Sequence, residues 1–296
     1  MNKKSLTLTV IAKMTANYGE GLGNVSSIQR VFRNNQAYAI RSKESLKNAV
    51  MVQSGMYDDL EVSIDGAAQK LVSEDINAAN NRSLEGGYMN TKAGKDKSTY
   101  KRNSSIYFTD AISTESFVNE TRFHNDLYLA ERYANLNGLN VQKDADKVGL
   151  MPFQYEFDKG LKSYSVTIDL EEIGKDDNFA EEASNEEKIE RVNAILDAIQ
   201  HLSLIVKGNL DNAEPLFVVG GISERKTHVF ENVVKVKNNK LIISEELQNR
   251  LNDGFSCGLM LGDIFDNEKE IVEKLSPESV NKFFEKLKDN VRDFYN

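Results

Sequence analysis

The sequence contains little cysteine, little histidine and no long apolar run, and each shortage excludes a class of protein. Cys257 is the single cysteine among 296 residues, so no intramolecular disulfide can form. No segment approaches the roughly 18 consecutive apolar residues that a membrane-spanning helix needs. The apolar stretch near the N-terminus is too short for a signal peptide. We therefore expect a cytoplasmic protein with no membrane partner.

The few histidines also restrict the catalytic chemistry. His124, His201 and His228 do not lie at metal-ligand spacing with one another or with Cys257, so the sequence predicts no metal site and no cofactor. The segment Gly254-Phe-Ser-Cys-Gly258 has the G-x-S-x-G pattern of a nucleophile elbow, but every histidine precedes it, whereas the base usually follows. We predict no catalytic residue.

The glycine-rich segment 19–23 suggests at most a weak nucleotide site. It lacks the third glycine of G-x-G-x-x-G and the G-K-[ST] end of a P-loop. A tight loop and a backbone approach to an anionic ligand explain its glycines equally well.

The charge of the chain is unevenly distributed. With 46 acids against 37 lysines and arginines, the formal charge is −9, which would oppose nucleic-acid binding if it were spread evenly. Residues 13–48 hold six bases against two acids, and residues 82–103 also hold six against two, whereas residues 169–190 hold ten acids and two lysines. Both basic stretches contain glycines, polar donors and side chains that can pack on bases, such as Tyr18, Tyr88 and Met89. This combination favours single-stranded nucleic acid as a ligand.

Hydrophobic periodicity predicts the order of elements. Strands are indicated at residues 6–10, 105–112, 162–170, 216–219 and 229–236, and a short helix at 127–136. Ser42 is a good N-cap for a helix over residues 42–51, and Ser184 with Glu187 forms a capping box for a helix that we expect to reach residues 207–208. Pro277 is expected to start a final helix in a largely helical C-terminal third. The order predicts an α+β chain with a ferredoxin-like, RNA-recognition-like βαββαβ palm and two large insertions.

Several of these segments resemble a known family. Asn17-Tyr-Gly-Glu-Gly-Leu-Gly-Asn24, Tyr38-Ala-Ile-Arg-Ser-Lys-Glu-Ser-Leu-Lys47, Gly87-Tyr-Met89 with Lys101-Arg102, Asp110-Ala-Ile-Ser113 and Gly220-Gly-Ile occur in this order. The set is similar to the backbone subunits of CRISPR Cascade complexes, with the type I-B, DevR-type branch as the best match. The likeness extends over most of residues 5–240.

The resemblance implies a non-enzymatic protein shaped like a right hand. The palm would comprise residues 1–53, 104–113 and 161–240, with fingers at 54–103, a thumb at 114–160 and a helical C-terminal region at 241–296. Copies would stack along the spacer part of a CRISPR guide RNA, beside other Cascade subunits, and would meet target DNA through the guide.

The resemblance also implies residue roles. We expect guide-RNA contacts from polar, basic and soft side chains of both basic stretches and of the loop after residue 219: Asn17, Asn24, Ser26, Ser27, Arg41, Ser42, Lys47, Met89, Lys92, Lys101, Arg102, Arg225, Lys226 and His228. Met151 and Phe153, on the returning arm of the thumb, would wedge at a displaced base. Ser42 is equally explained as a helix cap, and Met89 as core filler.

Two other functions stay open. Related backbone subunits of type III complexes cut RNA with an aspartate in the loop before the first helix, but residues 30–40 here contain no acid. The alternatives are a ferredoxin-like RNA-processing nuclease and a protein-interaction scaffold that binds no RNA.

Overall fold

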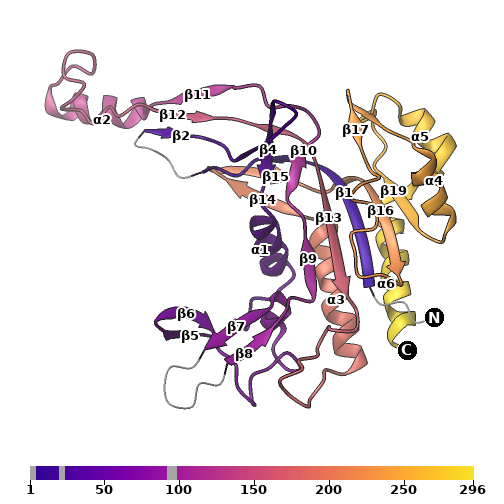
Figure 1. Cartoon of the computed structure of the whole chain (residues 1–296). Helices are drawn as coiled ribbons and strands as arrows, with labels where there is room; N and C mark the ends of the chain where they lie inside the picture. The colour runs from indigo at the N-terminus through magenta and orange to yellow at the C-terminus, as the bar shows by residue number, and fades with distance from the viewer. Residues whose placement is uncertain (1–4, 20–23, 92–98) are drawn as a thin grey trace.

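The computed structural model describes residues 5–19, 24–91 and 99–296, which form a mixed α+β fold (Figure 1). The helices are α1 (Lys43–Gln53), α2 (Leu127–Asn137), α3 (Asn185–Gln200), α4 (Glu245–Asn252), α5 (Glu268–Leu275) and α6 (Val280–Tyr295), with a 3₁₀ helix η1 (Arg82–Gly86). The strands are β1 (Ser5–Thr15), β2 (Val25–Ser26), β3 (Arg30–Arg33), β4 (Gln36–Arg41), β5 (Val62–Asp65), β6 (Ala67–Lys70), β7 (Tyr88–Thr91), β8 (Thr99–Arg102), β9 (Ile106–Phe108), β10 (Ala111–Ser113), β11 (Thr121–His124), β12 (Phe153–Glu156), β13 (Lys159–Asp169), β14 (Ser203–Val206), β15 (Asn209–Asn212), β16 (Pro215–Ser223), β17 (Val236–Lys237), β18 (Lys240–Leu241), β19 (Ser256–Leu259) and β20 (Glu278–Ser279).

The central sheet confirms the predicted βαββαβ palm. Strand β1 lies between β16 and β13, and β13 pairs on its other side with both β9 and β10. Helix α1 connects the first part of the sheet to β9, and α3 connects β13 to β16. This is the ferredoxin-like strand order, extended by β4 and β3 at one edge and by β19 and β20 at the other.

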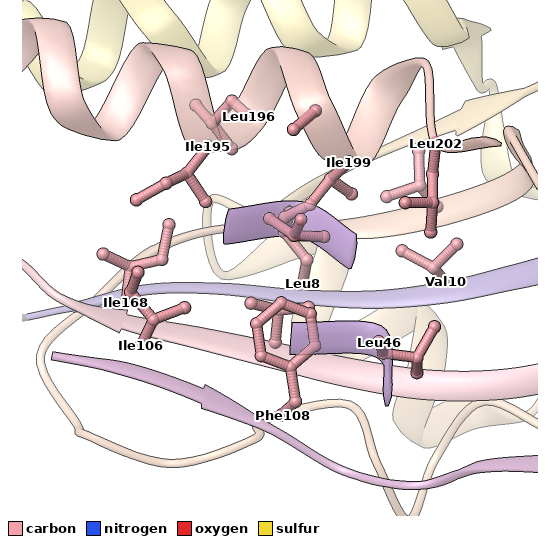
Figure 2. Close-up of a cluster of buried hydrophobic side chains, with 14 of the residues drawn as sticks. Leu8, Val10, Leu46, Ile106, Phe108, Ile168, Ile195, Leu196, Ile199 and Leu202 are labelled. Atoms are coloured by element: carbon pink, nitrogen blue, oxygen red, sulfur yellow. The ribbon is translucent and has the colours of Figure 1, made fainter. Parts of the chain in front are cut away.

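The two faces of the sheet differ because side chains alternate along each strand. Leu8 and Val10 of β1 point to the face covered by α1, α3 and α6, where they join the main hydrophobic core (Figure 2). Thr7 and Thr9 point to the opposite face, where the Thr9 and Ser165 hydroxyls lie 2.7 Å apart. Part of that second face is covered by a smaller apolar cluster of Ile11, Phe217 and the C-terminal region.

The two insertions project from the palm. One contains η1 and the β5–β6 and β7–β8 hairpins, and the other, which we call the arm (residues 119–157), contains β11, α2 and β12 (Figure 1). Strand β12 pairs with β11 and, in parallel, with β2, so a short segment of the N-terminal part supports the base of the arm. The residue limits given above for palm, fingers and thumb remain predictions.

Four predicted elements differ from the structure in type or extent. The helix after Ser184 ends at Gln200, and residues 203–206 form strand β14 instead. The segment 229–236 consists mainly of turns, with only its last residue in β17. The single strand predicted at 105–112 is divided into β9 and β10, and the final helix begins at Val280, after β20, rather than at Pro277.

Candidate nucleic-acid interface

A groove of about 1140 Å³ lies on the face of the palm sheet that α1 and α3 leave uncovered. Strands β10 and β13 form its floor, where Ile112 and Ser163 are register partners. The β3–β4 hairpin borders one side, and the segment 231–242 borders the other. The groove therefore lies where the helix-free face of an RNA-recognition-like sheet meets the C-terminal part of the chain.

The rim of this groove is basic. Exposed Arg33, Lys43, Lys235 and Lys237 line it, against the two acids Asp110 and Glu231. The Asp110 carboxylate is already engaged, because its Oδ1 accepts a hydrogen bond of 2.8 Å from the backbone N–H of Lys43 at the start of α1. The groove thus combines positive charge at its rim with a polar floor, which suits a phosphate backbone.

Besides the groove, aromatic side chains form a second candidate surface for nucleic acid, on one face of the arm. The rings of His124 and Phe153 are stacked with centroids 5.4 Å apart, and the Tyr155 ring lies 4.8 Å from that of His124. The Tyr18 ring contacts Tyr155 edge-on, and the Lys207 Nζ lies 5.1 Å from the Tyr18 centroid. Flat rings beside a cation can stack on unpaired bases.

The structure brings some predicted residues together at the base of the arm. Ser26 pairs in register with Tyr155 and accepts a 3.3 Å hydrogen bond from Lys207, and the carbonyl of Asn24 accepts a 2.8 Å bond from the backbone N–H of Gln154. Ser27 is half-buried beside them. Phe153 is exposed on the same small sheet, and Met151 is exposed just before it. The N-terminal loop and the thumb residues, predicted separately, thus share one surface.

The side chains of Asn17 and Ser42 form hydrogen bonds within the protein. The Asn17 Oδ1 accepts from the backbone N–H of Ser42 at 2.7 Å, and its Nδ2 donates to the Ser45 hydroxyl at 3.2 Å. The Ser42 side chain accepts from the Ser45 N–H and caps α1, as the alternative explanation of Ser42 predicted.

Arg41 and Lys47 are turned inward, which does not fit the predicted phosphate contacts. The buried Arg41 guanidinium donates to the Thr15 carbonyl at 3.3 Å. The Lys47 Nζ donates to the Gly86 carbonyl at 2.8 Å and to the Ser104 hydroxyl at 2.7 Å. Burial lowers the pKa of Lys47 to about 8. Lys47 thus joins the palm to the first insertion, and Arg41 joins β4 to β1 within the palm.

Arg102 is likewise not available to a ligand in this structure. Its guanidinium is buried, and it donates to the Glu85 carboxylate at 2.9 Å and to the carbonyls of Leu84 and Lys175 at 2.8 and 2.7 Å. Its neighbour Lys101 is exposed on β8, directly opposite the exposed Met89 of β7. These two stay candidates for RNA contact, whereas Lys92 lies outside the described residues.

Two of the three predicted RNA-binding residues in the loop after β16 are engaged by other parts of the protein. Lys226 forms a 2.6 Å ion pair with Asp169, which raises its pKa, and the His228 Nδ1 lies 2.8 Å from the Thr167 hydroxyl. Burial lowers the pKa of His228. Arg225 is exposed. The histidine and lysine thus fix the loop across the sheet, whereas Arg225 offers an exposed cation there.

The rim lysines and two arm aromatics, His124 and Tyr155, were missed at the sequence level, whereas Phe153 beside them was predicted. Lys235 and Lys237 flank the buried Val236, so charged and apolar residues alternate at the end of the segment 229–236, and this alternation is a signal for the rim that the sequence does contain. Across the described ranges, no group of three or more histidine, cysteine, aspartate or glutamate side chains is placed to hold a metal ion. None of the described helices is long and apolar enough to cross a membrane.

A ferredoxin-like palm with a long arm places this chain in a recognisable structural class. One solved chain, titled "CRISPR RNA-guided surveillance complex, pre-nicking", aligns with a TM-score of 0.59 and 11% identity over 96% of this chain and 100% of that chain. Another, titled "CRISPR RNA-guided surveillance complex", aligns with a TM-score of 0.56 and 14% identity over 97% and 98%. At these identities the likeness is one of fold.

The family follows from the sequence itself. The model for the family described as "CRISPR-associated negative auto-regulator DevR/Csa2" matches residues 70–244, which is more than half of the chain. The protein therefore belongs to the DevR/Csa2 family of CRISPR-associated proteins. No curated protein sequence matches it.

Proposed function

We propose that this protein is a guide-RNA-binding backbone subunit of a CRISPR interference complex of type I, and of subtype I-B as the sequence resemblance indicates. Several copies bind side by side along the spacer of the guide, next to other subunits of the complex, and meet target DNA through the guide. The protein has no catalytic role. Family membership and the shared fold support a place in such a complex.

The observation that most supports RNA binding is the groove with its basic rim. Cations at Arg33, Lys43, Lys235 and Lys237 surround a floor that includes the serines Ser113, Ser163 and Ser165. Such a surface binds the phosphate backbone of a single strand irrespective of sequence, so that base pairing of the guide supplies specificity. The aromatic face of the arm offers rings on which an unpaired base can stack.

Charge reversal at the rim tests this proposal. We expect Lys235→Glu with Lys237→Glu to lower the affinity for a labelled single-stranded RNA roughly tenfold or more, measured by fluorescence anisotropy, because two phosphate contacts become repulsive. The matched control is Lys269→Glu with Lys282→Glu, which makes the same charge change at exposed helix positions that do not line the groove. An equal loss of RNA affinity in both variants would contradict the proposal, because it would show that net charge, rather than the groove, determines binding.

Two other results would contradict the proposal. Cleavage of RNA in the presence of a divalent metal, abolished by substitution of one acidic residue, would support a nuclease. A protein that binds no RNA at any salt concentration would support an interaction scaffold instead.

A further inference from the structure

The basic rim of the groove does not by itself distinguish RNA from DNA. Its four cations suit phosphate groups, and both kinds of strand carry the same phosphate at every nucleotide. The group that separates the two strands is the ribose 2′-hydroxyl, which can donate and accept a hydrogen bond. When phosphates are held at the rim, the sugars that join them lie toward the floor. A preference for RNA therefore depends on the polar groups of the floor.

Most hydroxyl groups on the lining of the groove already have partners within the protein. The following lie within 2.7 to 3.3 Å of a hydrogen-bond partner: Tyr38, Thr109, Thr114 and Ser165. Ser113 follows Ile112 on β10, and its hydroxyl is fully buried, because alternation points the two side chains to opposite faces. These hydroxyl groups are thus engaged or beneath the floor.

Ser163 differs from the other hydroxyl residues of the groove. It is half-buried, and within the described part of the chain its hydroxyl forms no hydrogen bond. Its register partners are Ile11 of β1 on one side and Ile112 of β10 on the other. Register partners share a face of the sheet, and Ile11 belongs to the apolar cluster on the helix-free face. Ser163 thus presents one polar group between two isoleucines on the groove floor.

We propose that the Ser163 hydroxyl contacts a ribose 2′-hydroxyl and that the groove thereby selects RNA over DNA. This inference rests on the proposed function, because it concerns the strand that the same groove binds. A deoxyribose offers a CH₂ group in place of the 2′-hydroxyl, so Ser163 would lose its water and gain no partner. The contact depends on the sugar and not on the base, which agrees with binding irrespective of sequence.

Strands of one base sequence with different sugars test the proposal on the unsubstituted protein. We expect a short single-stranded RNA to bind roughly five- to tenfold more tightly than the DNA strand with deoxyuridine for uridine, measured by fluorescence anisotropy, because DNA leaves a hydroxyl unpaired. A 2′-fluoro strand keeps the sugar pucker of RNA but has no hydroxyl, so it should bind like DNA. Equal affinity for all three strands, or a 2′-fluoro strand that binds like RNA, would overturn the proposal.

Substitutions at Ser163 test which residue makes the contact. Ser163→Ala should lower the affinity for RNA and leave that for DNA unchanged, so that the ratio of the two approaches one. Ser163→Thr keeps a hydroxyl at this position and should retain most of the preference. The matched control Thr114→Val removes a hydroxyl that already donates to the Leu161 carbonyl, and it should keep the ratio of the unsubstituted chain. A Ser163→Ala variant with unchanged thermal unfolding and a full preference for RNA would overturn the assignment.

The rim variant separates this inference from the proposed function. Lys235→Glu with Lys237→Glu should weaken the binding of RNA and DNA alike and keep their ratio, because both strands carry the same phosphates. An unsubstituted chain that binds RNA and DNA equally well would refute the sugar contact and leave the function standing. A chain that binds neither strand would refute the function, and the sugar contact with it.

Discussion

Glu85 is a buried carboxylate that holds two arginines. Its Oε2 accepts from Arg102 at 2.9 Å, its Oε1 accepts from Arg191 at 2.8 Å, and the backbone N–H of Gly174 donates to it at 2.7 Å. The Ser105 hydroxyl donates to the same carboxylate. Through these bonds one side chain joins η1, β8, α3 and the loop after β13, so the first insertion is fixed to the palm.

We expect Glu85→Gln to destabilise the protein by about 3–5 kcal/mol, because two buried guanidinium groups would lose their shared counter-charge. The amide keeps the shape of the side chain, so the loss reports charge rather than packing. Chemical unfolding measures the free energy. The control Glu74→Gln, at an exposed position, should change it by less than about 0.5 kcal/mol. A Glu85 variant as stable as this control would show that the network contributes no net stability.

The sequence could predict where cations occur but not which of them are free. Arg102 and Lys101 are adjacent in the chain, yet one is buried against Glu85 and the other is exposed. Charged residues at successive positions of a strand point to opposite faces, but which face is buried here depends partly on Glu172 and Lys175. They lie 70 and 73 positions from Arg102 and approach it only in the folded chain. The partners of Arg41, Lys47 and Lys226 also lie far away in the sequence, at 26, 39 and 57 positions, so single-sequence reasoning had no signal for them.

At the scale of elements, Gly220 shows how closely two strands of the palm approach. A Cβ atom at this position of β16 would lie 2.0 Å from the Thr7 carbonyl oxygen and 2.9 Å from Leu8 Cδ2. Only a residue without a side chain fits there unless β1 and β16 move apart. Packing of the two strands thus requires a glycine at the start of Gly220-Gly-Ile, a segment that contributed to the family resemblance.

Gly220→Ala should therefore lower the free energy of unfolding by about 3 kcal/mol, because the added methyl group overpacks a fully buried strand pair. The matched control is Gly160→Ala in β13 of the same sheet, where a Cβ atom would meet nothing within 4 Å. That control should leave stability within about 0.5 kcal/mol of the unsubstituted chain or raise it slightly. Equal thermal unfolding of the two variants would contradict the close approach of β1 and β16.

Element boundaries were least predictable where the spacing of apolar residues fits both the helical and the strand period. Leu202 and Val206 continue the helical pattern of α3, but together with Leu204 they also alternate as in a strand, and the structure forms β14 at residues 203–206. Lys207 and Gly208, both with positive φ, make the tight turn of the hairpin that follows. In the segment 229–236, buried apolar residues such as Phe230 lie in turns that no strand pairs with, so burial alone resembled a strand.

At the scale of the whole molecule, the net charge of −9 and the basic groove have opposite effects on RNA binding. Acids are concentrated at residues 169–190, whereas four cations line the groove rim. At physiological salt the repulsion is screened beyond about 8 Å, so an RNA strand in the groove is affected mainly by the rim. A single copy should nevertheless bind weakly, and contacts between neighbouring copies should contribute much of the affinity on a long RNA.

Measurements at several salt concentrations and RNA lengths should separate the affinity that comes from phosphate contacts from the affinity that comes from contacts between copies. On a short RNA, the plot of log affinity against log salt should have a slope of about −3, since each phosphate contact on a single strand contributes about −0.7 and the rim offers four cations. On a longer RNA, binding should become cooperative, because copies that sit side by side also contact one another. Lys235→Glu with Lys237→Glu should flatten the slope on the short RNA, because two of the four rim cations are reversed. A slope that is unchanged in this variant would place the phosphates outside the groove.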